Sequence, residues 1–154
     1  MELREASYPA PYPDGWYRVA ASSDLKRGDV LYRDCLGHQM VLFRSDTSDE
    51  VHAMGAFCPH MGANLAGGCV KGGNLECPFH LWQLGTDGSV AKIPYLDKAP
   101  PRVRQQTWPV HEAYGQLFIY HRGDTSSGDD RPTQNRSTNI GLSAFLGSIG
   151  TGET

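Results

Sequence analysis

The sequence predicts a mostly β domain, and three observations support this prediction. The chain of 154 residues contains 18 Gly and 10 Pro, so the periodic runs between them are short. Short apolar runs bounded by turn residues favour strands over long helices. Dipeptides such as Asp-Gly separate the runs, as is typical of hairpins. The length fits one domain that buries about 70% of its unfolded surface.

The first half of the chain predicts strands joined by short polar turns. Residues 1–13 contain three Pro and little periodicity, so they form an N-terminal arm. A helical turn or tight loop is expected over Ser22–Asp29, with Gly28 placed to end it. Leu36-Gly37-His38 has the length of a hairpin connection, and Ser45–Glu50 is a polar turn. The strands expected here are Trp16–Ala20, Val30–Asp34, Gln39–Arg44 and Val51–Ala56.

The second half contains further turn signals and two last predicted strands. Thr86-Asp87-Gly88-Ser89 carries an Asp-Gly turn, so the segments around it are expected to form a hairpin. Pro94–Pro101 is a connection interrupted by proline. Val103–Val110 and Gly115–His121 are the last two expected strands, with Tyr114-Gly115 near their turn.

The C-terminal part differs in composition from the rest of the chain. No apolar residue occurs from Gly123 to Asn139. Such a segment cannot bury enough surface to offset its ordering entropy, so a linker or disorder is expected. Residues 140–154 are mildly apolar and are expected to form a short helix or the truncated start of a further domain. The expected organisation is an arm at 1–13, a domain at 14–122, a linker at 123–139 and a tail at 140–154.

Composition and charge argue against several classes of protein. The net charge of −3 and the pI near 6.0 are not those of a nucleic-acid-binding surface. No apolar run approaches the length of a membrane span, and Met1–Glu5 lacks the apolar run of a signal peptide. A soluble, cytoplasmic protein is therefore expected. Cys35 and Cys69 are expected to be free thiols there, although the sequence leaves a bridge between them open.

One stretch of the chain concentrates residues that bind metals. It begins with Cys58-Pro59-His60-Met61-Gly62 and ends with Cys77-Pro78-Phe79-His80, and sixteen residues separate His60 from Cys77. Each half offers one thiolate and one imidazole, which are ligands of zinc and of iron–sulfur centres. The candidate metal ligands are Cys58, His60, Cys77 and His80.

Three interpretations of this stretch are open. A mononuclear zinc site takes the same residues, but its paired ligands usually lie two to four residues apart, whereas one residue separates Cys58 from His60. A Rieske [2Fe–2S] centre has two irons, one held by two Cys and the other by two His, so neighbouring ligands need not converge on one atom. The third interpretation is a chance grouping of ordinary side chains. The spacing favours the two-iron centre.

The motif pair and its flanks resemble a known family. Gly15–Val19, Ala56–Ala63 and Ile93–Tyr95 are similar to the N-terminal Rieske domain of sterol-acting Rieske oxygenases, the group of cholesterol 7-desaturases and 3-ketosteroid 9α-hydroxylases. The resemblance covers roughly Tyr12 to Arg122. It implies an antiparallel β-sandwich of the Rieske (ISP) type, with a cluster-binding subdomain of two ligand loops.

The resemblance also implies the role of each ligand. Cys58 and Cys77 would hold the inner iron of one [2Fe–2S] cluster, and His60 and His80 the outer iron. Neutral imidazoles in place of anionic thiolates ease the uptake of an electron. They raise the reduction potential into a range of roughly −150 to +300 mV, against about −400 mV for plant-type ferredoxins.

The residues around the ligands place the expected potential at the low end of that range. High-potential Rieske proteins of respiratory complexes have a disulfide between the loops, and a Ser and a Tyr that donate hydrogen bonds to sulfur. Here Ala63 and Phe79 occupy the positions of the disulfide cysteines, and Trp82 and Leu84 those of the Ser and Tyr. A quinol-oxidising role is therefore not expected.

The remaining aromatic and histidine residues are assigned structural roles. Phe57 and Phe79 are expected to pack in the β core, and Trp82 either to pack there or to shield the cluster. The histidines outside the motif are expected to be strand or turn residues and not ligands: His38, His52, His111 and His121.

The expected function is transfer of one electron. A Rieske oxygenase also needs a mononuclear iron held by two His and a carboxylate, and no suitably spaced pair of His occurs outside the motif. The chain is expected to be the Rieske portion of a sterol-type oxygenase or desaturase without its mononuclear-iron domain. Its partners would be an electron-donor reductase and an oxygenase catalytic domain or subunit. The alternatives are a free-standing Rieske ferredoxin-like carrier and a structural zinc-binding module.

Overall fold

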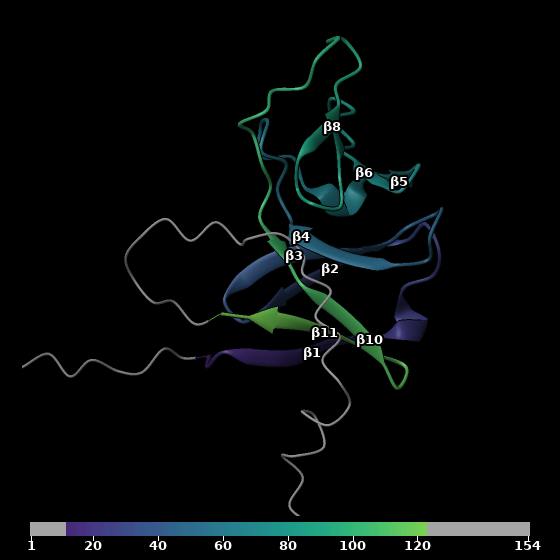
Figure 1. Cartoon of the computed structure of the whole chain (residues 1–154), viewed down its shortest axis with the longest axis vertical. Helices are drawn as coiled ribbons and strands as arrows, with labels where there is room; N and C mark the ends of the chain where they lie inside the picture. The colour runs from purple at the N-terminus through teal and green to yellow at the C-terminus, as the bar shows by residue number, and fades with distance from the viewer. Residues whose placement is uncertain (1–11, 123–154) are drawn as a thin grey trace, which may run out of the picture.

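The computed structural model describes residues 12–122, which form three antiparallel sheets (Figure 1). The predicted linker and tail, and most of the predicted arm, lie outside these residues. No helix among residues 12–122 is long and apolar enough to cross a bilayer.

The first sheet has the order β1-β11-β10, the second β2-β3-β4-β9 and the third β5-β6-β7-β8. The strands are β1 Gly15–Ala21, β2 Val30–Cys35, β3 His38–Arg44, β4 Val51–Gly55, β5 Cys69–Lys71, β6 Asn74–Glu76, β7 Gln83–Leu84, β8 Val90–Lys92, β9 Thr107–Trp108, β10 Val110–Ala113 and β11 Gln116–His121.

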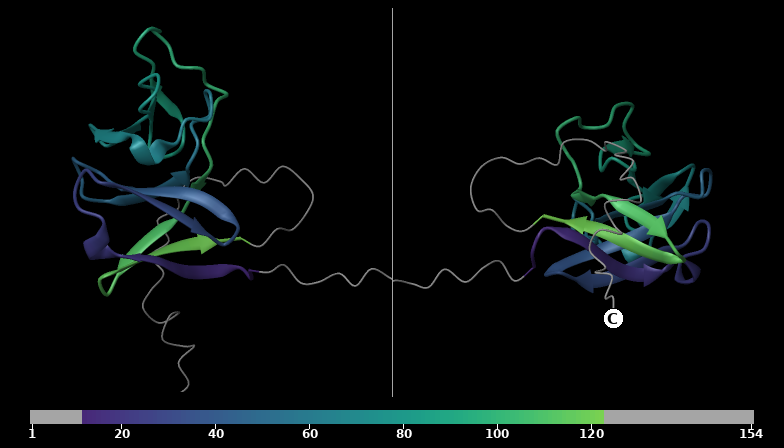
Figure 2. Two further views of the ribbon diagram at one scale, coloured as in Figure 1. Left: turned by 180° about the vertical axis from the view of Figure 1, so that it is seen from behind. Right: turned by 60° about the horizontal axis from the view of Figure 1, so that its bottom comes forward.

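The first two sheets form a β-sandwich, and the third sheet forms a subdomain beside the second (Figures 1 and 2). The expected mostly β, antiparallel architecture with a separate subdomain is confirmed. Strand β3 lies between the two cores, and its side chains alternate between them. Met40 and Leu42 pack in the sandwich core, whereas Val41 and Phe43 pack against the subdomain. All four are fully buried, which explains why residues 40–43 of this strand are continuously apolar.

The predicted hairpin turns are confirmed, with one shift. The turn between β2 and β3 contains only Leu36 and Gly37, with φ of 54° and 73°, so His38 belongs to β3 and not to the turn. Two positive φ values are the mark of a type I′ turn. Tyr114-Gly115 makes the turn between β10 and β11, and Gly88 has a φ of 80° in the turn between β7 and β8.

The predicted strand Val103–Val110 is wrong as one element. It contains β9 and the start of β10, which pair with different strands: β9 with β4, and β10 with β11. Pro109 stands between the two and has no N–H to donate to a ladder, so the chain changes partner there. Before β9, the backbone N–H of Gln105 donates to the carbonyl oxygen of Gly88 at 2.7 Å. The segment before β9 therefore runs alongside the turn between β7 and β8 as a loop.

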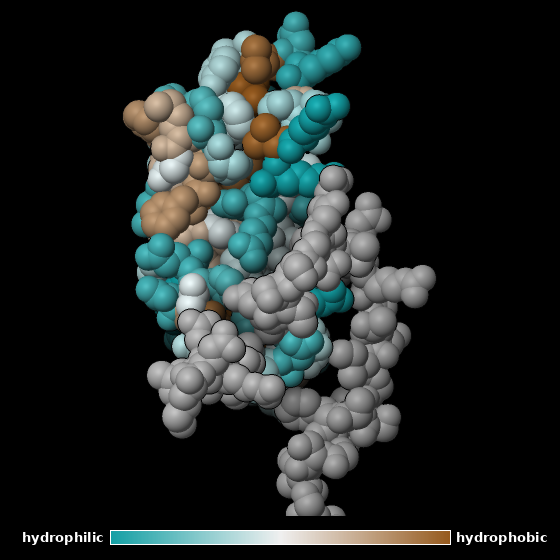
Figure 3. Space-filling view, turned by 90° about the vertical axis from the view of Figure 1, so that its left-hand side faces the viewer, coloured by the Kyte–Doolittle hydropathy of each residue, from teal (hydrophilic) through white to brown (hydrophobic). Residues whose placement is uncertain are grey.

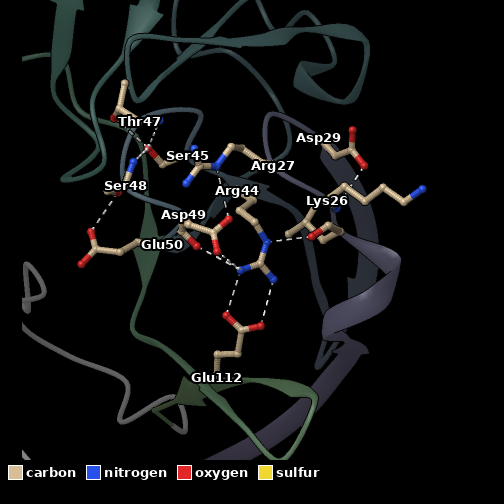
Figure 4. Close-up of polar contacts among 11 residues, drawn as sticks. Lys26, Arg27, Asp29, Arg44, Ser45, Thr47, Ser48, Asp49, Glu50 and Glu112 are labelled. Atoms are coloured by element: carbon tan, nitrogen blue, oxygen red, sulfur yellow. Dashed lines mark hydrogen bonds and ion pairs between the residues drawn. The ribbon is translucent and has the colours of Figure 1, made fainter.

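One ion-pair network joins the two sheets of the sandwich (Figure 4). The buried guanidinium of Arg44, at the end of β3, donates to both carboxylate oxygens of Glu112 on β10, at 3.0 and 2.9 Å. It also donates to the carbonyl oxygens of Leu25, at 2.7 Å, and Asp49, at 3.0 Å. Hydrogen bonding to Arg44 lowers the pKa of Glu112 below its usual value. The Arg44 guanidinium thus links β3 to three other segments of the chain, those of Leu25, Asp49 and Glu112.

Gly68 of the subdomain cannot be replaced by a larger residue without a shift of backbone. A Cβ atom on Gly68 would lie 2.2 Å from the carbonyl oxygen of Glu76 and 3.0 Å from that of Leu65. Neither contact is with a flexible side-chain end. A Cβ on the neighbouring Gly67 would have only an ordinary contact of 3.7 Å with the Pro78 ring.

We expect Gly68→Ala to lower the free energy of unfolding by about 1–3 kcal/mol, the usual cost of forcing extra volume into a packed site. Gly67→Ala is the matched control and should stay within about 0.5 kcal/mol of the wild type. Urea unfolding followed by fluorescence measures both. Equal stability of the two variants would contradict the close approach of Gly68 to Glu76.

Candidate metal centre

The structure brings the predicted ligands together as two pairs, thiol with thiol and imidazole with imidazole. The thiols of Cys58 and Cys77 are buried, and Cys77 is close enough to contribute to the raised pKa of Cys58. The ring centroids of His60 and His80 are 4.7 Å apart. Within residues 12–122, no three His, Cys, Asp or Glu side chains are grouped so that they could hold one metal ion. Two like pairs fit a centre with two irons better than a tetrahedral site on one ion.

The two segments that carry the ligands share one backbone frame. They are ligand loop 1 (residues 58–63), which follows β4, and ligand loop 2 (residues 77–82), which follows β6. In each loop the cysteine N–H donates to the carbonyl oxygen five residues on, at 2.9 Å in loop 1 and 2.8 Å in loop 2. The cysteine carbonyl accepts from the N–H four residues on, at 2.8 and 3.2 Å. That fourth residue has a positive φ in both loops, 73° for Gly62 and 59° for Leu81.

The imidazole of His60 has a nitrogen that fits a metal. Its Nδ1 atom is buried, and no hydrogen-bond partner for it occurs among the described residues. A buried polar atom without a partner is rare and marks a place where an unseen ligand can bind. The ring stacks on the indole of Trp82, with centroids 4.3 Å apart and planes 11° apart. The Nδ1 atom is therefore available to an iron.

The Cys58 thiol is protonated in this environment. Burial raises the pKa of the Cys58 thiol to about 11, and the neighbouring Cys77 adds to the rise. A thiol with so high a pKa is not ionised near neutral pH. Thiolates bind metals, and the positive charge of a metal is what favours ionisation at such a site. The donor set of two buried thiols and two imidazoles therefore fits a Rieske cluster.

A side chain far along the sequence holds the approach to ligand loop 1. The amide of Gln105 donates to the carbonyl oxygens of Gly55, at 2.8 Å, and Phe57, at 2.6 Å. Asn64 directly follows ligand loop 1. Its side chain accepts a hydrogen bond from the Ala66 N–H at 2.9 Å and so caps a short 3-10 helix, η2 (Leu65–Gly67). Sequence reasoning missed Gln105, since a single Gln in a polar loop carries no local signal.

A buried carboxylate lies next to ligand loop 2. Glu76 precedes the second cysteine and accepts hydrogen bonds from Lys71, at 2.6 Å, and from Gln83, at 3.0 Å. The hydrogen bond from Lys71 lowers the pKa of Glu76 below its usual value. The ammonium of Lys71 compensates this negative charge.

Two of the three aromatic predictions are wrong, and one is confirmed. Phe57 is 43% exposed and Phe79 is 64% exposed, whereas Trp82 is 7% exposed and packs in the subdomain core. Phe79 is exposed because it stands in the middle of ligand loop 2, where the backbone frame leaves no core beside it. Figure 3 shows apolar side chains gathered over the upper part of the molecule. We call the exposed apolar residues of this region the loop rim: Phe57, Met61, Phe79, Leu81, Tyr95 and Leu96.

The other histidines and cysteines lie away from this grouping. His38, His52, His111 and His121 are in strands β3, β4, β10 and β11, as the sequence analysis expected of strand residues. The rings of His38 and His121 are 5.5 Å apart, and His38 also contacts Trp108 at 5.3 Å. Cys35 on β2 and Cys69 on β5 are free thiols.

Comparison with known proteins gives a consistent result. Residues 15–109 match the family described as the Rieske [2Fe–2S] domain. The chain is 43% identical over 114 residues to the cholesterol 7-desaturase of Bombyx mori. The matched region is 73% of this chain and 25% of that protein. It is 41% identical over 113 residues to a probable 3-ketosteroid-9-alpha-monooxygenase oxygenase component of Rhodococcus rhodochrous, covering 73% and 28%. The crystal structure of apo dicamba monooxygenase superposes with a TM-score of 0.65 at 28% identity, covering 75% of this chain and 35% of the other. The chain thus spans about a quarter of the length of these two curated relatives.

Proposed function

Because this chain belongs to the Rieske [2Fe–2S] domain family, we propose that residues 14–122 form a one-electron carrier that holds one cluster. Cys58 and Cys77 bind the inner iron, and His60 and His80 bind the outer iron. The observation that carries the proposal is the pairing of thiol with thiol and imidazole with imidazole on two loops of one backbone frame. When bound, the cluster supplies a centre that is reduced and oxidised by one electron.

The surrounding residues define how an electron reaches the centre. The two cysteines lie in the subdomain core, which excludes water from the inner side. The two histidines are half-buried and lie in loops whose exposed residues belong to the loop rim. A donor or acceptor protein would therefore contact the side of His60 and His80, which would hold the outer iron. An apolar rim suits a protein partner, because its burial is favourable without fixed charges.

The local hydrogen bonds support a potential at the low end of the Rieske range. The indole N–H of Trp82 donates to the hydroxyl oxygen of Tyr95 at 2.7 Å, so it is not directed at a cluster sulfur. The Leu84 side chain has no donor, and Ala63 and Phe79 cannot form a disulfide. Fewer hydrogen bonds to sulfur mean less stabilisation of the reduced state.

The similarity to two sterol-acting proteins supports a role in a sterol-type oxygenase or desaturase. The chain would receive an electron from a reductase. It would pass that electron to the mononuclear iron of an oxygenase catalytic domain or subunit. This is tested by mixing the reduced protein with a separately expressed catalytic domain of that class in a stopped-flow spectrometer. Rapid reoxidation is the expected result, whereas transfer only to small soluble acceptors would favour a free-standing carrier.

The purified protein is expected to be red-brown, with two irons per chain and the rhombic EPR signal of a Rieske centre after reduction. Cys77→Ser removes one ligand of the inner iron and should abolish the visible absorption. Cys69→Ser is the matched control, because Cys69 is exposed and free, and it should keep the full spectrum. A colourless protein that contains stoichiometric zinc would overturn the proposal.

A further inference from the structure

We propose that Tyr95 is a positioning residue for the metal centre: it holds the Trp82 indole, and the indole holds the His60 imidazole in one orientation. This inference rests on the proposed function, because His60 matters only if it binds the outer iron. The three side chains form a continuous series from the surface to the ligand. Tyr95 accepts from the Trp82 Nε1–H at 2.7 Å, and Trp82 stacks on His60 with planes 11° apart.

The His60 ring depends on this stacking because no hydrogen bond is seen to hold its inner nitrogen. Its Nδ1 atom has no partner among the described residues, since in the proposed function it binds iron. The other ring contact is the edge of His80, with planes 73° apart, and that imidazole is a ligand itself. Among residues 12–122, the indole is therefore the aromatic surface other than a proposed ligand on which the ring stacks. Groups that orient a metal ligand change the properties of the metal, even though they do not touch it.

The indole depends in turn on Tyr95. Trp82 is almost fully buried, and a buried N–H that loses its partner costs roughly 1–3 kcal/mol. The acceptor is presented by a turn in which the Leu96 N–H donates to the Ile93 carbonyl oxygen at 3.2 Å. Pro94 stands at the second position of this turn, which proline favours, and Ile93 is buried in the same core as Trp82. The turn thus fixes where the hydroxyl lies.

Tyr95 is not held there by burial of its own ring. Its side chain is 59% exposed, so its defined contact in the structure is the hydrogen bond to Trp82. The two proposed histidine ligands also have different aromatic neighbours. His80 contacts the exposed ring of Phe79, with centroids 3.9 Å apart, and no comparable hydrogen-bonded indole supports it. A change at Tyr95 should consequently affect one of the two histidines.

The test uses the full chain loaded with its cluster, in the variants Tyr95→Phe, Trp82→Phe and the double variant. Tyr95→Phe removes one hydroxyl, and Trp82→Phe keeps an aromatic ring but removes the N–H, so each single change breaks the same hydrogen bond. Tyr114→Phe is the matched control, because Tyr114 is an exposed tyrosine in the turn between β10 and β11 of the first sheet. Voltammetry measures the reduction potential, and pulsed EPR measures the nitrogen couplings of the two histidine ligands.

We expect both single variants to shift the potential in the same direction, beyond any shift in the control. The double variant should shift it no further than the larger single change. One set of histidine nitrogen couplings should change and the other should stay. A Tyr95→Phe protein with the potential and couplings of the wild type would overturn the inference and leave the proposed function intact. A wild-type protein without a Rieske EPR signal would overturn both.

Discussion

His80→Cys is expected to lower the reduction potential by on the order of 100 mV or more, toward the values of all-cysteine ferredoxins. The substitution replaces a neutral imidazole by an anionic thiolate at the outer iron. The added negative charge opposes the arrival of an electron, so the oxidised state becomes relatively more stable. Protein-film voltammetry on the iron-loaded variant measures the change, and His60→Cys should act in the same direction.

The matched control is His111→Cys, which makes the same substitution at an exposed position of β10 in the first sheet. It should leave the potential unchanged. A His80→Cys protein that assembles a cluster and shows no shift, or a rise, would contradict the assignment of His80 as a ligand. The comparison separates the effect of a ligand from that of adding a thiol to the chain.

Arg44→Met is expected to lower the free energy of unfolding by about 3 kcal/mol. Removing one partner of a buried ion pair typically costs 3–5 kcal/mol. We expect the lower end because the Glu112 side chain is 36% exposed and keeps part of its hydration. The variant also loses the hydrogen bonds to the Leu25 and Asp49 carbonyl oxygens. Urea unfolding near neutral pH measures the loss.

The pH dependence of this effect has a definite sign. The folded-state pKa of Glu112 is depressed, so the pair contributes its full stability above the ordinary glutamate value of 4.5. That contribution is lost as the pH falls through the lower folded-state pKa. The difference between wild type and Arg44→Met should therefore shrink in acid. Glu50→Gln, at an exposed acid, is the control and should be nearly neutral at either pH. A deficit that is the same in acid would mean that lost side-chain volume, and not the ion pair, causes it.

The parts of the fold that the sequence predicted are those with a strong local signal. Gly37, Gly88 and Gly115, the glycines of the three predicted turns, all have the positive φ that glycine favours. Strands β5 and β6 were not predicted, because three residues on each side of a glycine pair are too few to show alternation. Local pattern is informative only over several residues.

The candidate site shows the same division between local and distant information. The four ligands were identified from their spacing, since both loops are short and each is contained in one stretch. The support of ligand loop 1 was not identified, because Gln105 lies 48 residues from Phe57. The ion pair of the sandwich escaped for the same reason, because Arg44 lies 68 residues from Glu112. Phe57 was assigned to the core from its residue type alone. Exposure of that ring is set by how the chain turns into ligand loop 1, which a single sequence does not reveal.

The shared backbone frame of the two ligand loops has a consequence for how a partner can dock. The two frames match residue by residue, but the histidine follows Cys58 by two residues and Cys77 by three. Met61 therefore stands where the second loop has its imidazole, and Phe79 stands where the first loop has its own. A flexible thioether consequently flanks the centre on one side and a rigid phenyl ring on the other. A docking protein that fits one of these does not fit the other equally well, so the two loops offer a partner different surfaces.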